Sequence, residues 1–138
     1  MNKAQQTIVS ILKKHIIYST YLSFTLLFFL YKGFDYLIIR SYTPLILITA
    51  IVVLFIWGAG NSKIKFRKII NLWAILLIIW SSSRILLSLM NQFVKQVPQS
   101  HISEQLGTSD FMLSLLFLSG AIYLLRNKKR VFKDKANR

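Results

Sequence analysis

Long apolar runs alternate with short polar segments along this chain, and four of the runs are long enough to cross a lipid bilayer. They cover about residues 16–36, 42–59, 69–90 and 106–125. A hydrocarbon core about 30 Å thick needs roughly 20 apolar residues in a helix. Backbone groups in lipid must also satisfy their own hydrogen bonds, which favours helices. The pattern therefore predicts an all-α, polytopic integral membrane protein, with four transmembrane helices in one small antiparallel bundle that forms a single domain.

The residues between the runs give local signals for where helices begin and end. Pro44 suits the first turn of a helix, because its missing N–H has no partner there. Tyr42 and Trp57 fall where amphipathic aromatic side chains settle at the two membrane interfaces. The segment 58–61, Gly-Ala-Gly-Asn, predicts a stop and a turn after the second run. The segment 107–110, Gly-Thr-Ser-Asp, supplies a breaker and helix-capping groups before the fourth.

Composition and charge support a membrane protein. Hydrophobic side chains make up 54% of the 138 residues, against about 45–50% in soluble domains. The net charge of +14 would suggest nucleic-acid binding in a soluble protein, but the apolar runs give it another meaning. The chain has no cysteine, which excludes disulfides, thiolate nucleophiles and cysteine-bound metals.

The basic residues are distributed asymmetrically about the four runs. The first and third loops hold only Lys32, Arg40 and Lys95, whereas 14 basic residues lie before the first run, between the second and third, and after the fourth. These are Lys3, Lys13, Lys14, Lys63, Lys65, Arg67, Lys68, Arg126, Lys128, Lys129, Arg130, Lys133, Lys135 and Arg138. By the positive-inside rule, both termini and the loop at 61–68 are cytoplasmic, and Arg40 and His101 face outward. We expect a multi-pass protein of the cell (inner) membrane or of an organelle membrane, with its first span retained as a signal anchor.

The basic tail at 126–138 is expected to contact anionic lipid headgroups, at about 1 kcal/mol for each basic residue near the surface. The residues expected to make these contacts are Arg126, Lys128, Lys129 and Arg130. Nucleic acid is not an expected partner, because the tail has a single aromatic residue, Phe132, and no recognisable binding fold around it.

The third run contains one charge, Arg84, among serines. Ser81, Arg84, Ser88 and Asn91 are separated by three, four and three residues, so they share one helical face. An arginine at a helix centre costs about 2.5–3.5 kcal/mol on insertion, and each Leu or Ile returns about 0.3–0.6 kcal/mol. The twelve Leu and Ile residues of 69–90 therefore outweigh the charge, and the run is still predicted to insert.

Two other runs contribute polar residues that could face Arg84. Thr25 lies on a line with Tyr18, Tyr21 and Lys32 in the first run, and Asp35 follows one turn later; Asp110 and Ser114 are four residues apart in the fourth. The predicted intramembrane polar cluster comprises Arg84, Ser81, Ser88, Asp110, Ser114, Thr25 and Asp35. Two interpretations remain open. In the first, Arg84 has a structural role: its side chain either snorkels to the membrane interface or pairs with Asp110 or Asp35. In the second, Arg84 belongs to a binding or conduction site.

No catalytic constellation is recognisable in the sequence. It contains no phosphate-binding glycine loop, His-Glu-x-x-His motif or nucleophile elbow, so no enzyme activity, cofactor or metal is expected. We expect an accessory, scaffold or immunity-like subunit that forms homo- or hetero-oligomers with other membrane proteins. One alternative is an oligomeric transporter or channel for small solutes or ions, with Arg84 lining an outward-facing polar pocket. The other is a membrane-embedded lipid-processing enzyme.

Overall fold

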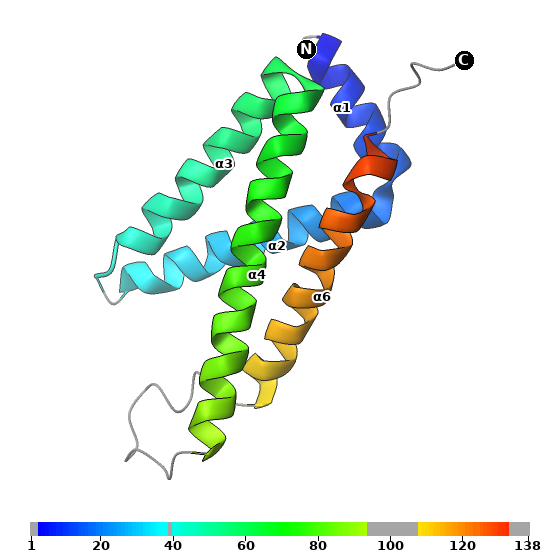
Figure 1. Ribbon diagram of the computed structural model, residues 1–138. Coiled ribbons are helices and arrows are strands. Elements are labelled where there is room, and N and C mark those ends of the chain that lie inside the picture. The colour runs from blue at the N-terminus through cyan, green and yellow to red at the C-terminus, as the bar shows by residue number, and fades with distance from the viewer. Residues whose placement is uncertain (1–2, 39, 94–107, 133–138) are drawn as a thin grey trace. The chain divides into compact units, whose positions relative to one another are not determined.

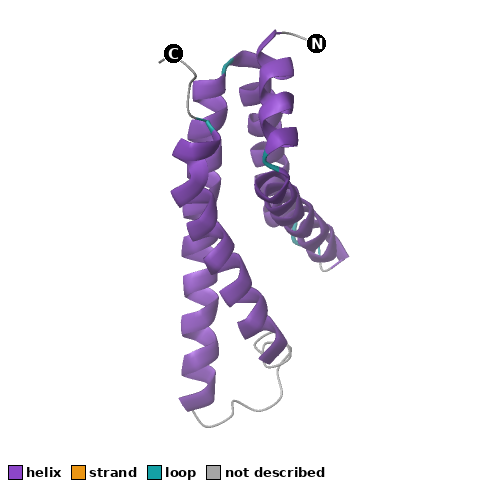
Figure 2. Cartoon of the chain, turned by 90° about the vertical axis from the view of Figure 1, so that its right-hand side faces the viewer, coloured by secondary structure: helices purple, strands orange, loops and turns teal. Residues whose placement is uncertain are grey.

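The computed structural model describes residues 3–38, 40–93 and 108–132, and every regular element within these ranges is a helix. The helices are α1 (Lys3–Lys14), α2 (Ile16–Ile38), α3 (Thr43–Asn61), α4 (Lys63–Phe93) and α6 (Thr108–Val131), as Figures 1 and 2 show. The all-α prediction is confirmed. Two helices are long and apolar enough to cross a membrane: α3, and α4 over Lys63–Met90. The runs predicted at 16–36 and 106–125 coincide with α2 and most of α6, and their membrane crossing stays a prediction.

The chain divides into two compact units. Unit 1 comprises Met1–Trp73 and Arg126–Arg138, and unit 2 comprises Ala74–Leu125. Helices α4 and α6 each continue through the boundary, so the prediction of a single membrane domain is not decided by this division.

The connection between α3 and α4 corrects the sequence analysis, which predicted a loop at 61–68. Helix α3 continues through Asn61 and α4 begins at Lys63, so only Ser62 lies between them. Ser62 has extended backbone angles, and its side-chain oxygen accepts a hydrogen bond from the backbone N–H of Lys65 at 3.2 Å. A serine that caps the next helix in this way replaces the expected loop.

Gly58 does not end α3 as its sequence context suggested. It is buried inside the helix, where an added Cβ would lie 2.3 Å from Ile69 Cδ1 and 3.5 Å from Phe66 Cα. The missing side chain therefore lets the first turns of α4 pack closely against α3. Phe55 and Phe66 complete this contact, with their ring centroids 5.9 Å apart.

Helix α2 buries one face within unit 1, formed by Tyr18, Leu22, Thr25 and Gly33. At Gly33 the backbone approaches α3, because an added Cβ would lie 3.2 Å from Leu45 Cα and from Ile48 Cγ2. Closer to the start of α2, Trp73 of α4 packs its ring edge-on against Phe29, with centroids 5.4 Å apart. Small residues and aromatic rings thus position α2 against both candidate spans.

The turn between α2 and α3 places a charged residue in an unusual backbone conformation. Arg40 has φ of 58°, its N–H donates to Leu37 O at 2.9 Å, and the N–H of Ser41 donates to Tyr36 O at 3.0 Å. These bonds form the left-handed helix ending that glycine usually provides. Helix α3 then begins at Thr43 with proline in its first turn, as the sequence predicted.

Candidate functional site

Unit 2 contains a seam of small and apolar residues between two helices that run side by side in Figures 1 and 2. The buried positions follow intervals of three, four or seven residues on both helices. They are Ala74, Leu77, Ser81 and Ser88 on α4, and Ser114, Phe117, Ala121 and Leu124 on α6. Trp80 of α4 meets Phe117 of α6 edge-on, with ring centroids 5.7 Å apart. Serine and alanine at such positions allow helix backbones to approach closely in membranes.

Arg84 lies on α4 between the two buried serines of this seam, and its side chain is half-buried. Its guanidinium carbon lies 5.3 Å from the centroid of the Trp80 ring, one turn earlier. A cation over an indole face is attracted by the negative charge of that face, by about 0.5–2 kcal/mol. Trp80 therefore accommodates the charge that the sequence left unexplained, and the ring contact with Phe117 ties it to α6.

The serines of the predicted stripe are inside the protein. Ser81, Ser88 and Ser114 are exposed by only 0%, 3% and 1%. Among the described residues, the Ser81 hydroxyl has no hydrogen-bond partner, and such a group normally needs one when it is buried. This placement favours close helix packing over a water-lined surface at these three positions.

The predicted polar cluster is divided between the two units. Thr25 belongs to unit 1, where its hydroxyl donates to Leu22 O at 2.9 Å and accepts from Trp73 Nε1 at 3.0 Å. Asp35 also belongs to unit 1 and pairs with Lys32, with 3.5 Å between Nζ and Oδ2. This pairing was one of the alternatives that the sequence offered for Asp35. Asp110 is in α6, but its side chain lies outside the described residues, as does that of Asn91.

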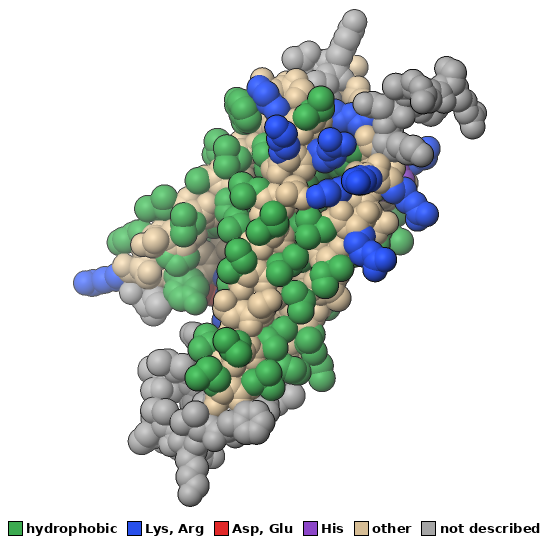
Figure 3. All heavy atoms as spheres, viewed as in Figure 1, with side chains coloured by type: hydrophobic (Ala, Val, Ile, Leu, Met, Phe, Trp, Pro, Cys, Tyr) green, Lys and Arg blue, Asp and Glu red, His purple; other side chains and the backbone are tan. Residues whose placement is uncertain are grey.

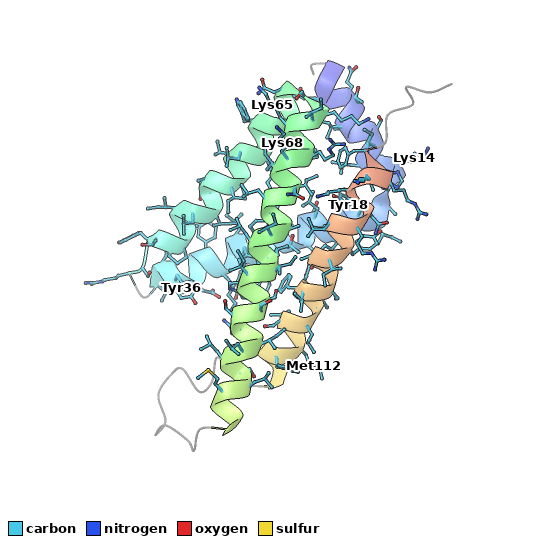
Figure 4. All side chains as sticks on the ribbon, viewed as in Figure 1. Lys14, Tyr18, Tyr36, Lys65, Lys68 and Met112 are labelled. Atoms are coloured by element: carbon cyan, nitrogen blue, oxygen red, sulfur yellow. The ribbon has the colours of Figure 1, made fainter. Side chains whose placement is uncertain are left out.

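Basic residues from three separate segments gather at one end of unit 1. Figure 3 shows the Lys and Arg side chains together there, and Figure 4 places Lys14 at the end of α1 and Lys65 and Lys68 near the start of α4. We call this surface the basic end. Its members are Lys13, Lys14, Lys63, Lys65, Arg67, Lys68, Arg126, Lys128, Lys129 and Arg130.

The expected lipid-contact residues lie in the helical part of this surface. Helix α6 continues through them to Val131, because Arg and Lys are good helix formers and cations are favoured at a helix C-terminus. Arg126, Lys129 and Arg130 are exposed. Lys128 is half-buried, and its Nζ donates to the side-chain oxygen of Asn71 on α4. Three of the four residues are thus available to headgroups, and the fourth also has a structural contact.

The residues that hold the basic end together were not predicted from the sequence. Phe132 is 2% exposed, and its ring meets Tyr18 of α2 and Phe66 of α4 edge-on, at centroid distances of 6.3 and 6.1 Å. Asn71 is the one polar residue in the run from Ile69 to Ile79. A polar group in such a run needs a partner, so this signal could have identified Asn71 as a contact residue. No comparable signal marked Phe132.

The described residues contain no group of three or more His, Cys, Asp or Glu side chains that could hold a metal ion. His101 and Glu104, which are one turn apart in sequence, lie outside the described ranges. No family model, curated protein or solved structure matches the chain.

Proposed function

We propose that this chain is a multi-pass membrane protein that acts by association, as an accessory, scaffold or immunity-like subunit of a membrane complex. The observation that carries the proposal is the exposed apolar surface of α3. Over its 19 residues the helix has no charged side chain, and only Ile48, Phe55 and Gly58 are buried. Large side chains such as Ile46 and Ile56 are about two-thirds exposed, at 65% and 66%. Only lipid or another apolar helix can cover such a surface favourably.

The dimensions of α3 match a bilayer. Nineteen residues rise by about 28 Å in a helix, close to the hydrocarbon thickness of about 30 Å. Tyr42 and Trp57 are both exposed near its two ends, as expected for aromatic side chains at the interfaces. Lys65 Nζ lies 4.6 Å from the centroid of the Trp57 ring, so a cation and an aromatic ring mark the same interface.

Membrane insertion and sidedness are tested first. Because the chain has no cysteine, single cysteines at Ser41 and Ser62, which flank α3, report the two ends of one helix. We expect the protein to remain in membranes after alkaline carbonate extraction. An impermeant thiol reagent added outside intact cells should label Ser41→Cys and leave Ser62→Cys unlabelled. Extraction into the soluble fraction, or the reverse labelling pattern, would overturn the proposed topology.

Association is tested by photocrosslinking from α3. A photoreactive residue replaces Val53, which is 58% exposed, or Phe55, which is 6% exposed and packs on Phe66. We expect the first position to give a discrete crosslinked protein band in native membranes, and the second to crosslink only within the chain. If Val53 crosslinks only to lipid, α3 is not an association surface, and the proposed mode of action is wrong for this helix.

Transport is the second candidate, because Arg84 is half-buried on α4 between two buried serines, Ser81 and Ser88. Association requires Arg84 as part of helix packing through Trp80, so Arg84→Leu should lower stability by about 0.5–2 kcal/mol. Transport requires it as an anion site, so the same variant should stay stable and lose anion flux in proteoliposomes. Normal stability with lost flux would favour transport over association.

A further inference from the structure

We propose that the basic end is one composite site for anionic phospholipid headgroups, formed jointly by the ends of α1 and α6 and the start of α4. The inference rests on the proposed membrane function and deepens it by assigning the binding of anionic lipid to three segments together. It differs from binding by the tail alone, because two of the three segments lie more than 50 residues from the tail in sequence. Eight of the ten basic side chains of this surface are exposed, and Lys63 and Lys128 are half-buried.

The charges of this surface have no acidic residue beside them in the described part of the chain. Asp35 is the one acidic side chain that the structure describes, and it pairs with Lys32, in the second half of α2. The repulsion among the eight exposed cations is therefore not relieved by carboxylates on the described segments that carry them. Anions from outside the chain would relieve it.

The start of α4 carries the wrong charge for helix stability. Its first two turns hold Lys63, Lys65, Arg67 and Lys68 and no acidic residue. The N-terminus of a helix has a positive partial charge, so cations there are unfavourable and anions are favourable. By contrast, the cations in the last turns of α1 and α6 are favoured by their helix dipoles. The exposed Lys65, Arg67 and Lys68 are thus better explained by an external anion than by the helix itself.

The three segments are held in place beneath the charges. Phe132 connects the end of α6 to Tyr18 and Phe66, and the hydrogen bond from Lys128 to Asn71 adds a polar contact. An added Cβ on Gly60 of α3 would lie 3.8 Å from Gln5 Nε2, which places α1 beside the α3–α4 turn. A preorganised set of cations binds an anion with a smaller entropic cost than a flexible tail does.

Lipid is the expected occupant because of where the surface lies. The two candidate spans, α3 and the Lys63–Met90 part of α4, meet at Ser62 within the basic end. The ends of spans lie at the headgroup layer, and Trp57 under Lys65 is typical of that layer. Headgroup phosphates would therefore be the nearest anions at high local concentration.

The test measures the affinity of the purified full chain in mild detergent for short-chain phosphatidylglycerol, with phosphatidylcholine of equal chain length as reference. Two patch variants, Lys13→Gln with Lys14→Gln and Arg126→Gln with Lys129→Gln, each remove two charges from different segments. The matched control, Lys32→Gln with Arg40→Gln, removes two charges at the other end of α2 and in the α2–α3 turn. We expect about a thirtyfold weaker affinity for each patch variant, from about fivefold per charge, and less than about twofold for the control.

A further variant separates arrangement from charge. Phe132→Ala keeps every basic residue but removes the ring between Tyr18 and Phe66. It should weaken phosphatidylglycerol binding by about tenfold, because the three segments lose their preorganisation; unchanged binding would contradict the composite site. Phe132→Leu, which keeps an apolar side chain of similar length, should weaken it less. Circular dichroism of each variant confirms that the helices remain folded.

Several results would overturn the composite site. One is wild-type binding without preference for phosphatidylglycerol. Another is weakening confined to the α6 variant, which would assign binding to the tail alone. A third is displacement of phosphatidylglycerol by a short RNA whose binding is weakened by the same variants, which would assign the surface to nucleic acid. Carbonate extraction tests the membrane proposal separately. A protein that is extracted into the soluble fraction would contradict that proposal, and its affinity for the lipid could still be measured.

Discussion

Removing the hydrogen bond between Trp73 and Thr25 tests most directly how α2 and α4 are held together in unit 1. Trp73 Nε1 donates to Thr25 Oγ1 at 3.0 Å, and the two residues are 3% and 0% exposed. Thr25→Val replaces the hydroxyl by a methyl group of nearly the same size. The variant therefore leaves the indole N–H buried and unpaired without creating a large cavity.

The expected cost follows from the surroundings of the bond. A buried donor that loses its partner costs about 1–3 kcal/mol in a water-soluble protein. Side-chain hydrogen bonds inside membrane proteins contribute less, about 0.6 kcal/mol on average and at most about 1.7. The second bond of Thr25, to Leu22 O, adds little, because that carbonyl belongs to a continuous helix. We expect Thr25→Val to lower the free energy of unfolding by about 1 kcal/mol.

The assay is titration of the detergent-solubilised full chain with SDS, followed by far-ultraviolet circular dichroism. Thr20→Val, at an exposed position of the same helix, is the matched control for replacing a hydroxyl by a methyl group. A double-mutant cycle with Trp73→Phe isolates the pairwise term, which should be close to the effect of Thr25→Val. Equal stability of Thr25→Val and Thr20→Val, together with no coupling in the cycle, would refute the proposed role of this bond.

Three other substitutions test particular backbone and surface features by the same titration. Arg40→Gly should raise stability by about 1 kcal/mol, because glycine adopts the left-handed conformation at φ of 58° without steric cost; a loss would show that the Arg40 side chain stabilises the turn. Gly58→Leu should cost more than about 2 kcal/mol and Gly58→Ala clearly less, since the end of the Ile69 side chain can move but the Phe66 backbone cannot. Lys32→Gln should change stability by less than about 0.5 kcal/mol, because both side chains of its pair with Asp35 are exposed at the surface of the protein; a larger loss would indicate that the pair is shielded.

Four of the five described helices could be located from the sequence alone, whereas α1 was not predicted. Apolar runs of about 18 or more residues leave few alternatives to a helix in lipid. Helices α2, α3, α4 and α6 coincide with the four predicted runs to within a few residues, apart from the extensions of α4 and α6. Periodicity also predicted that Ser81, Arg84 and Ser88 share a face, because side-chain direction in a helix follows from residue spacing alone. The first turn of α3 at Pro44 was also predictable, because the missing N–H of proline would have no partner in a first turn.

The partners of these side chains could not be predicted from the sequence and depend on the tertiary packing. Gly58 suggested a helix end by composition, but the approach of Phe66 and Ile69 makes it a packing position inside α3. Thr25 was assigned to a polar cluster with Arg84, but Trp73, 48 residues away, uses its hydroxyl. Partner choice depends on which helix faces meet, and contacts between residues far apart in sequence leave no local periodic signal.

The basic end was also predictable only in part from the sequence. Counting Lys and Arg residues predicted that three segments share one side of a membrane, since the rule concerns only their order along the chain. Their assembly into one surface depends on Phe132, which is buried between Tyr18 and Phe66. A single aromatic residue in a basic tail has no pattern of its own, so its burial was decided by the shape of the surface that α2 and α4 present to it.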